Sequence, residues 1–128
     1  MKKKILIVVA SYYESIANSL LKSAKNKINN KCNIDVIRVP GAFEIPVTIA
    51  KNLKKFNGFI ALGCVIKGQT PHFDFISSAA TNAIMDLSIN FKKPIGNGIL
   101  TCLSMKQAKA RKRKGAEAAN AVISVLSQ

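Results

Sequence analysis

Short apolar runs alternate along this chain of 128 residues with stretches in which apolar side chains recur at helical spacing. Residues 5–10 form a continuous apolar run, which is typical of a strand buried on both faces of a sheet. From 16 to 28 the apolar residues recur every three or four positions, as on one face of a helix. The chain is therefore predicted to begin with a strand followed by a helix.

The same alternation repeats to the end of the chain. Residues 34–39 are rich in β-branched side chains and stop at Pro40-Gly41, and a helix lined by Ile45, Val47, Ile49, Ala50 and Leu53 is predicted to end near 56–58. The pattern then predicts a strand at 59–65, a loop at 67–71, a helix at 74–90, a strand at 95–101 and helices at 104–112 and 115–126. Four strands separated by helices predict an α/β fold: a flavodoxin-like three-layer sandwich, with a four-stranded parallel sheet and helices on both faces.

Length and composition favour a single domain over residues 1–128 with a genuine core, since 48% of the residues are apolar. The short apolar run near the amino terminus lacks the cleavage pattern of a signal peptide. No window approaches the roughly 20 apolar residues of a membrane helix, so we expect a cytoplasmic protein without a membrane partner. Cys32, Cys64 and Cys102 lack metal-ligand spacing and are expected to be reduced, mostly buried thiols.

The formal net charge of +14 raises the possibility of nucleic-acid binding, because Lys and Arg neutralise phosphates. Seventeen of the twenty basic residues are Lys, however, and they are scattered over polar helix faces. Proteins that read nucleic-acid sequence rely more on the planar fork of Arg. We interpret the charge as solvated helix faces that attract anionic ligands weakly, and expect no nucleic-acid partner.

Three segments follow predicted strand ends, where ligands bind in open parallel sheets: 11–13, 40–44 and 67–72. His72 is the only histidine, and its ordinary pKa suits proton transfer, although a structural role is equally compatible with the composition. Glu44 is either a favourable charge at a helix start or an acceptor for a polyol. Tyr12 and Tyr13 either pack on the sheet or stack on a planar ring.

Residues 63–70 nearly match the phosphate-binding pattern G-x-x-x-x-G-K-[ST], but Gln69 stands where the pattern needs Lys. Nucleotide hydrolysis is therefore not expected. The segment still offers Gly68, the Thr70 hydroxyl and backbone N–H groups at a helix entrance, which suit a single phosphate as well as an ordinary loop. In the basic cluster at 111–114, an Arg either ends a solvated helix or clamps a phosphate.

Over residues 5–126 these pieces together resemble the lumazine synthase family. The most specific strings are VPGAFEIP at 39–46, ALGCVIKGQTPHFDF at 61–75 and GILTCLSMKQAKAR at 98–111. The resemblance implies a transferase of riboflavin biosynthesis, without metal or organic cofactor. It would condense 5-amino-6-(D-ribitylamino)uracil with 3,4-dihydroxy-2-butanone 4-phosphate to 6,7-dimethyl-8-ribityllumazine, releasing phosphate and water. It also implies a homopentamer or a multiple of pentamers, with each active site shared between neighbouring subunits.

The resemblance assigns roles residue by residue. Tyr12 would stack on the pyrimidine, and His72 would act as the acid–base residue. The other implied substrate contacts are Ala42, Phe43 and Glu44 for the ribityl chain, Cys64, Val65 and Ile66 for the pyrimidine, Gln69, Thr70 and Arg111 for the phosphate, and Asn97. Of these, Asn97 and Arg111 would come from the next subunit.

The sequence departs from the family pattern at several positions. Ser11 replaces an Arg that often precedes the stacking aromatic, and Asn97 replaces a frequent Phe. The segment after Arg111 is short, so that Lys114 is the only candidate for the basic residue of this loop in the family. The amino terminus is also short, and the sequence is compatible with both a free pentamer and a larger shell of pentamers. The nearest alternatives are an archaeal-type riboflavin synthase and a flavin- or RNA-binding module. A phosphoacceptor receiver domain is disfavoured, because no Asp ends the third strand.

Overall fold

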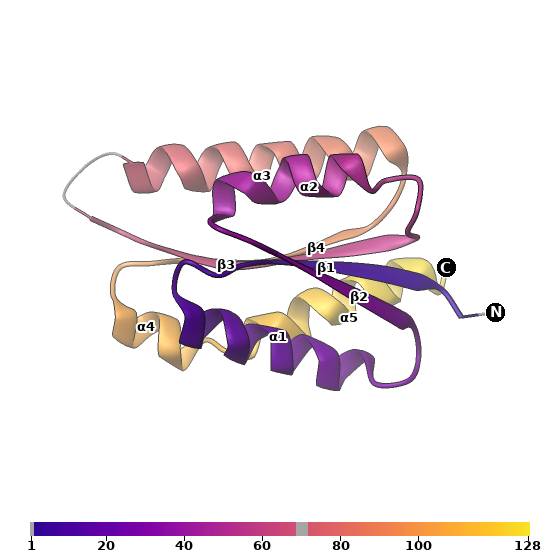
Figure 1. The fold of residues 1–128 in the computed structure, drawn as a ribbon, viewed down its shortest axis with the longest axis horizontal. Coiled ribbons are helices and arrows are strands. Elements are labelled where there is room, and N and C mark those ends of the chain that lie inside the picture. The colour runs from indigo at the N-terminus through magenta and orange to yellow at the C-terminus, as the bar shows by residue number, and fades with distance from the viewer. Residues whose placement is uncertain (1, 69–71) are drawn as a thin grey trace.

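The three-layer architecture predicted from the sequence is present in a computed structural model, which describes residues 2–68 and 72–128 (Figure 1). In chain order the elements are β1 (Lys4–Ala10), α1 (Glu14–Ile28), β2 (Asn33–Val39), the 3-10 turn η1 (Ala42–Glu44), α2 (Ile45–Lys51), β3 (Gly58–Ile66), α3 (His72–Phe91), β4 (Ile95–Cys102), α4 (Met105–Ala110) and α5 (Lys114–Leu126).

All strand pairs are parallel, and the strand order across the sheet is β2-β1-β3-β4. Helices α2 and α3 cover one face, and α1, α4 and α5 cover the other (Figure 1). The chain winds outward from β1 to β2 in one direction and through β3 to β4 in the other. The strand order therefore reverses between β1 and β3, which is the position where open α/β sheets bind ligands at the carboxyl ends of their strands.

The central strand β1 is buried on both faces, as its continuous apolar run predicts. Ile5, Ile7 and Val9 belong to the cluster with α1 and α5, whereas Leu6 and Val8 belong to the cluster with α2 and α3. Two hydrophobic clusters, one per face, thus hold the sandwich together.

Helix α5 packs closely against α1. A Cβ atom added at Gly115 would meet the backbone oxygen of Leu20 at 2.2 Å. The Ser23 hydroxyl on α1 accepts a hydrogen bond of 2.9 Å from the Ala116 backbone N–H in the first turn of α5. Glycine at 115 therefore lets the two helices approach, and Ser23 caps a helix that has no cap of its own.

The predicted end of the second helix near 56–58 is wrong, since α2 stops at Lys51. The Asn52 side chain donates to the Thr48 carbonyl at 2.8 Å, and a turn follows in which the Lys55 N–H donates to the Asn52 carbonyl. Such a local side-chain bond competes with continuation of the helix. Within this short helix Ile45 and Ile49 are buried, whereas Val47 is exposed.

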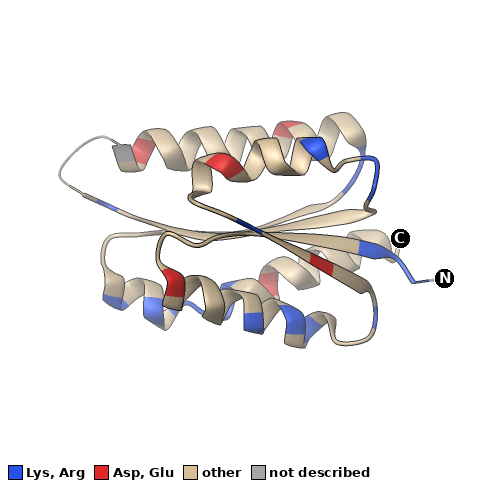
Figure 2. Cartoon of the chain, viewed as in Figure 1, with Lys and Arg blue, Asp and Glu red and all other residues tan. Residues whose placement is uncertain are grey.

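The basic side chains are less evenly scattered than the sequence suggested. Many of them lie on the layer formed by α1, α4 and α5, shown blue in the lower part of Figure 2. They include Lys22, Lys25, Lys27, Lys106, Lys109, Lys112 and Arg113, all exposed. Of the helices within residues 2–68 and 72–128, none is long and apolar enough to cross a membrane.

Candidate functional site

A cleft of about 830 Å³ opens where the strand order reverses. Its walls come from four segments that are far apart in the sequence: the β1–α1 turn, the turn after β2, the end of β3 and the first turns of α3. The lining residues are Tyr12, Tyr13, Pro40, Gly41, Ala42, Phe43, Glu44, Cys64, Val65, Ile66, Phe75, Ile76 and Ala79. This combination of mostly apolar walls and a few polar groups is typical of a small-molecule site.

Three aromatic side chains in this lining are largely exposed: Tyr12 at 75%, Phe43 at 62% and Phe75 at 69%. An aromatic ring left in solvent at a cleft is available to cover a planar ligand. Tyr13 is different, because it packs against the core and its ring contacts that of Tyr12 edge-on at 4.9 Å. Burial, with smaller contributions from Tyr12 and Cys64, raises the pKa of Tyr13.

The turn after β2 is closed by a reciprocal pair of hydrogen bonds. The Gly41 N–H donates to Glu44 Oε1 at 2.9 Å, and the Glu44 N–H donates to the Gly41 carbonyl at 3.1 Å. The carboxylate therefore holds its own turn in shape and keeps a second oxygen as an acceptor. The two interpretations of Glu44 from the sequence, a helix-start charge and a polyol acceptor, are compatible in this geometry.

The end of β3 carries Cys64, Val65 and Ile66 to the floor of the cleft. Burial, together with the nearby Cys102 thiol, raises the pKa of Cys64 to about 11. The thiol is therefore neutral at physiological pH and unsuited to act as a nucleophile. Gly63 lies within the same strand, where an added Cβ would meet the Ala10 Cβ at 3.1 Å. The glycine spacing of a nucleotide-binding loop thus has no counterpart here, because Gly63 is part of the sheet.

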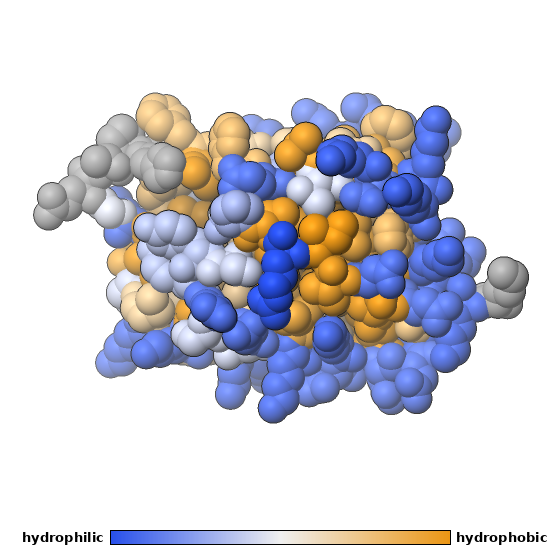
Figure 3. Space-filling model, in the orientation of Figure 1, coloured by the Kyte–Doolittle hydropathy of each residue, from blue (hydrophilic) through white to orange (hydrophobic). Residues whose placement is uncertain are grey.

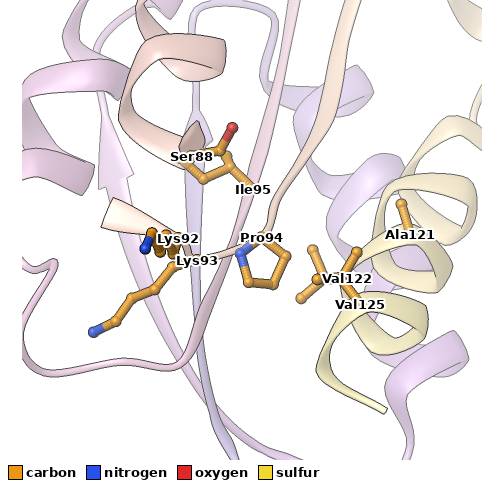
Figure 4. A pocket seen from close by; sticks show the side chains of 8 residues that line it. All are labelled: Ser88, Lys92, Lys93, Pro94, Ile95, Ala121, Val122 and Val125. Carbon is orange, nitrogen blue, oxygen red and sulfur yellow. The ribbon is translucent and has the colours of Figure 1, made fainter. Parts of the chain in front are cut away.

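A second hollow, of about 380 Å³, lies at the other end of the sheet, beside the start of β4 and the end of α5. Its lining is mostly apolar, and the Lys93 ammonium group points away from Pro94 and Val122 (Figure 4). That ammonium group donates to the Leu53 carbonyl. The hollow has less than half the volume of the cleft and does not lie at the carboxyl ends of the strands, so the cleft is the better candidate site.

Comparison with known proteins gives one consistent result. A sequence model of the 6,7-dimethyl-8-ribityllumazine synthase family matches residues 2–128. The chain belongs to this family. It is similar to 6,7-dimethyl-8-ribityllumazine synthases of Agrobacterium fabrum, at 43% identity over 98% of this chain and 93% of the relative, and of Bartonella tribocorum, at 41% identity over 99% and 91%. The enzyme of Bartonella henselae is 42% identical over 98% of this chain and 88% of its own length.

Among the lumazine synthase positions inferred from the sequence, one group comes together in the cleft: Tyr12, Ala42, Phe43, Glu44, Cys64, Val65 and Ile66. Two others, Asn97 and Arg111, are not among the cleft's lining residues. The Asn97 side chain accepts a hydrogen bond of 3.0 Å from the Ile99 N–H, and Arg111 is exposed at the end of α4.

The remaining predicted positions are those of the phosphate loop and the acid–base residue. Gln69 and Thr70 lie outside the described residues. His72 is the first residue of α3, and the placement of its side chain is likewise outside the described part of the structure. The start of α3 lies two residues before the predicted helix, so His72 belongs to the helix whose first turns line the cleft.

Several residues that line the cleft were not among the site residues predicted from the sequence, and three of them belong to α3. Phe75, Ile76 and Ala79 line the cleft from this helix, and Pro40 lines it from the turn after β2. The spacing of 75, 76 and 79 places them on one helical face, which was the available signal. Which neighbour that face meets depends on the tertiary fold. Within residues 2–68 and 72–128, no cluster of three or more His, Cys, Asp or Glu side chains is arranged to hold a metal ion.

Proposed function

We propose that this cleft condenses 5-amino-6-(D-ribitylamino)uracil with 3,4-dihydroxy-2-butanone 4-phosphate, which forms 6,7-dimethyl-8-ribityllumazine and releases phosphate and water. The observation that carries the proposal is the convergence of the β1–α1 turn, the 40–44 turn and the end of β3 on one cleft. These are the segments that the family resemblance relates to the pyrimidine and its ribityl chain.

In the proposed complex, the exposed Tyr12 ring stacks on the pyrimidine, and backbone groups of 64–66 at the strand end bind the edge of that ring. The ribityl hydroxyls lie along residues 42–44. Because one Glu44 oxygen is already used by the Gly41 N–H, the other oxygen is the acceptor that remains for a hydroxyl. The phosphate of the second substrate is assigned to Gln69 and Thr70.

The chemistry requires alignment and proton transfer. The amine attacks the ketone and forms a Schiff base with loss of one water, a proton is then removed as phosphate leaves by elimination, and the ring closes with loss of a second water. Holding two reactants in a productive geometry supplies on the order of 7–11 kcal/mol in favourable intramolecular models, and a placed acid–base group typically adds about 10² to 10⁴-fold. His72 is the proposed acid–base group, acting from the start of α3.

We infer that the active site is completed by a second copy of the chain in a homo-oligomer, a pentamer or a multiple of pentamers. Asn97 and Arg111, the positions implied for the neighbouring subunit, do not line the cleft of their own chain. Helix α3 also leaves apolar side chains exposed, among them Met85 at 57%, Ile89 at 63% and Phe91 at 53%. Large exposed apolar side chains on one helix favour an interface between subunits.

The edge strand β2 supports the same inference. Ile34, Val36 and Ile37 are only half-buried, and in the space-filling view apolar surface is open in the middle of the face shown (Figure 3). A location in the cytoplasm is also proposed, since Cys32, Cys64 and Cys102 are all free, as is usual in a reducing compartment.

The deciding experiment mixes the purified protein with the two substrates and follows the fluorescence of the lumazine product, with each substrate omitted in turn as a control. We expect product only when both are present. Riboflavin formation from lumazine alone would instead identify a riboflavin synthase. Salt-sensitive RNA binding without any turnover would identify a binding module, and either result would refute the proposal.

The cleft itself is tested with a matched pair of variants. Tyr12→Ala removes the exposed ring from the cleft and is expected to raise KM for the pyrimidine substrate. Val125→Ala is the control, since Val125 is also exposed, at 45%, but lines the hollow at the other end of the sheet. Equal effects of the two variants on KM would mean that the cleft is not the site.

A further inference from the structure

The β1–α1 turn, which carries Tyr12 and Tyr13 into the cleft, has few restraints of its own. Tyr13 is the N-cap of α1, and its side chain makes no capping hydrogen bond. The turn sequence Ser-Tyr-Tyr contains no Gly or Pro to restrict its backbone. Because Tyr12 is 75% exposed, packing of its own ring holds it only weakly. Apart from its edge-on contact with the Tyr13 ring, the position of the Tyr12 ring depends on how this turn is held.

Arg38 on the edge strand β2 reaches across this turn. Its Nη2 donates to Asn18 Oδ1 at 3.0 Å, and its Nη1 lies 3.5 Å from Ser11 Oγ. Ser11 precedes the two tyrosines, and Asn18 lies in the first turns of α1 that follow them. One guanidinium group therefore contacts both ends of the connection that presents Tyr12.

The backbone brings Arg38 to this position. Val9 is paired with Arg38 in the parallel ladder between β1 and β2, and the Ser11 N–H donates to the Val39 carbonyl at 2.9 Å. These bonds extend the ladder up to the start of the turn. The planar fork of Arg can address two acceptors at once, which an ammonium group on a flexible stem cannot do with the same geometry.

We propose that Arg38 is a positioning residue for the pyrimidine substrate, because it fixes the β1–α1 turn and thereby the place of the Tyr12 ring in the cleft. This inference rests on the proposed function of the cleft. Arg38 does not line the cleft, so it acts through Tyr12 and not by touching the substrate.

The first test is binding of 5-amino-6-(D-ribitylamino)uracil alone, measured by calorimetry. Arg38→Met keeps the apolar stem and removes both contacts, and we expect it to weaken binding about 3- to 10-fold, the size of effect typical for loss of an exposed hydrogen bond to a charged group. Arg38→Lys should recover only part of the loss. Lys31→Met, which removes the same charge from the exposed turn before β2, should change nothing.

A double-mutant cycle identifies the route of the effect. In a Tyr12→Ala background, Arg38→Met is expected to cause no further loss of binding. An equal loss in both backgrounds would show that Arg38 does not act through Tyr12, and an unchanged affinity in Arg38→Met alone would also overturn the proposal. The KM for the phosphate substrate is expected to stay constant in Arg38→Met, whereas a general loss of structure would change both KM values.

A third measurement needs no ligand. Amide hydrogen exchange at residues 12–14 is expected to be faster in Arg38→Met than in the parent protein and in Lys31→Met. Unchanged exchange there would refute the positioning role even if the cleft has another function. If the parent protein binds no pyrimidine but exchange still quickens, the proposed function has failed while the structural role of Arg38 stands.

Discussion

At the scale of single residues, the surroundings of a side chain decide what it can do in this cleft. Cys64 and Tyr12 line the same space, yet Cys64 is buried and Tyr12 is exposed. Burial keeps the Cys64 thiol neutral, so it contributes shape, while the exposed Tyr12 ring is free to cover a ligand. Glu44 combines a structural role with a binding role. One oxygen of its carboxylate accepts a hydrogen bond from the Gly41 N–H of its own turn, and the other oxygen remains available to a ligand.

The raised pKa of Cys64, about 11, predicts a specific dependence on pH. The folded state favours the neutral thiol, so this contribution to stability is complete below the ordinary thiol pKa and is lost as the pH rises toward about 11. Alkylation of Cys64 by iodoacetamide should accordingly be slow at pH 8 and accelerate over that alkaline range, as followed by peptide mass mapping with half-buried Cys32 as the reference. Fast labelling of Cys64 at pH 8 in folded protein would contradict this prediction.

His72→Ala is expected to slow turnover without abolishing it, because the proposed site works mainly by alignment. A placed acid–base group contributes typically about 10² to 10⁴-fold, and the loss should fall within that range. The measurement is kcat in single-turnover and steady-state assays, together with circular dichroism to confirm the fold. A complete loss of activity in a folded variant would show that proton transfer outweighs alignment.

At the scale of elements, the close contact between α1 and α5 supports the layer from which Arg111 and the basic cluster extend. Gly115 permits the contact, and Ser23 satisfies an N–H group at the start of α5. Both act across more than ninety positions of sequence, since Ala116 and Ser23 are separated by 93 residues. A helix start is thus completed by a side chain from another helix.

Gly115→Ala should lower the free energy of unfolding by about 1–3 kcal/mol, the usual cost of adding atoms to a packed contact. The added Cβ would meet the Leu20 carbonyl oxygen, which is backbone and cannot rotate away. Urea unfolding followed by circular dichroism measures the change. The control is Asn120→Ala, at an exposed position of the same helix, for which we expect a change within about 0.5 kcal/mol. A neutral Gly115→Ala would mean that the helices separate at little cost.

At the scale of the whole molecule, the proposed function predicts that turnover depends on assembly, because Asn97 and Arg111 do not line the cleft of their own chain. In a closed ring, the cleft of each subunit would receive Arg111 from one neighbour, and the subunit's own Arg111 would enter the cleft of the other neighbour. In the proposed ring, a residue of the cleft and Arg111 would therefore belong to different chains of one site, and this separation can be tested without knowing the number of subunits.

The variants Tyr12→Ala and Arg111→Ala are each expected to have low activity alone. When their subunits are mixed and reassembled, part of the activity should be restored. Random mixing in equal amounts places a normal cleft beside a normal Arg111 in about a quarter of the sites, so about a quarter of the parent activity is expected. The control mixture, Tyr12→Ala with Glu44→Ala, impairs the same wall and should gain much less. Light scattering before and after mixing reports the assembly size. No gain in the first mixture, with subunit exchange demonstrated, would refute a shared site.

Much of the fold and part of the site were predictable from the sequence alone. The order of strands and helices follows from local periodicity, because apolar runs and helical spacing are properties of neighbouring residues. The parallel sheet follows from the regular alternation of strands and helices, and the family strings include residues at strand ends that line the cleft. The end of α2 was not predictable, because a bond from Asn52 to Thr48 overrides the apolar pattern there.

Only the tertiary structure decided which distant residues meet. It placed Phe75, Ile76 and Ala79 in the cleft. It also brought the Arg38 guanidinium group into contact with Ser11 and Asn18, on either side of the turn that carries Tyr12. Such contacts join segments that are far apart in the chain, so no local sequence pattern predicts them. Their geometry is determined by how the layers pack and not by periodicity. The sequence thus determined the elements and the chemistry they carry, and packing determined the arrangement in which that chemistry can work.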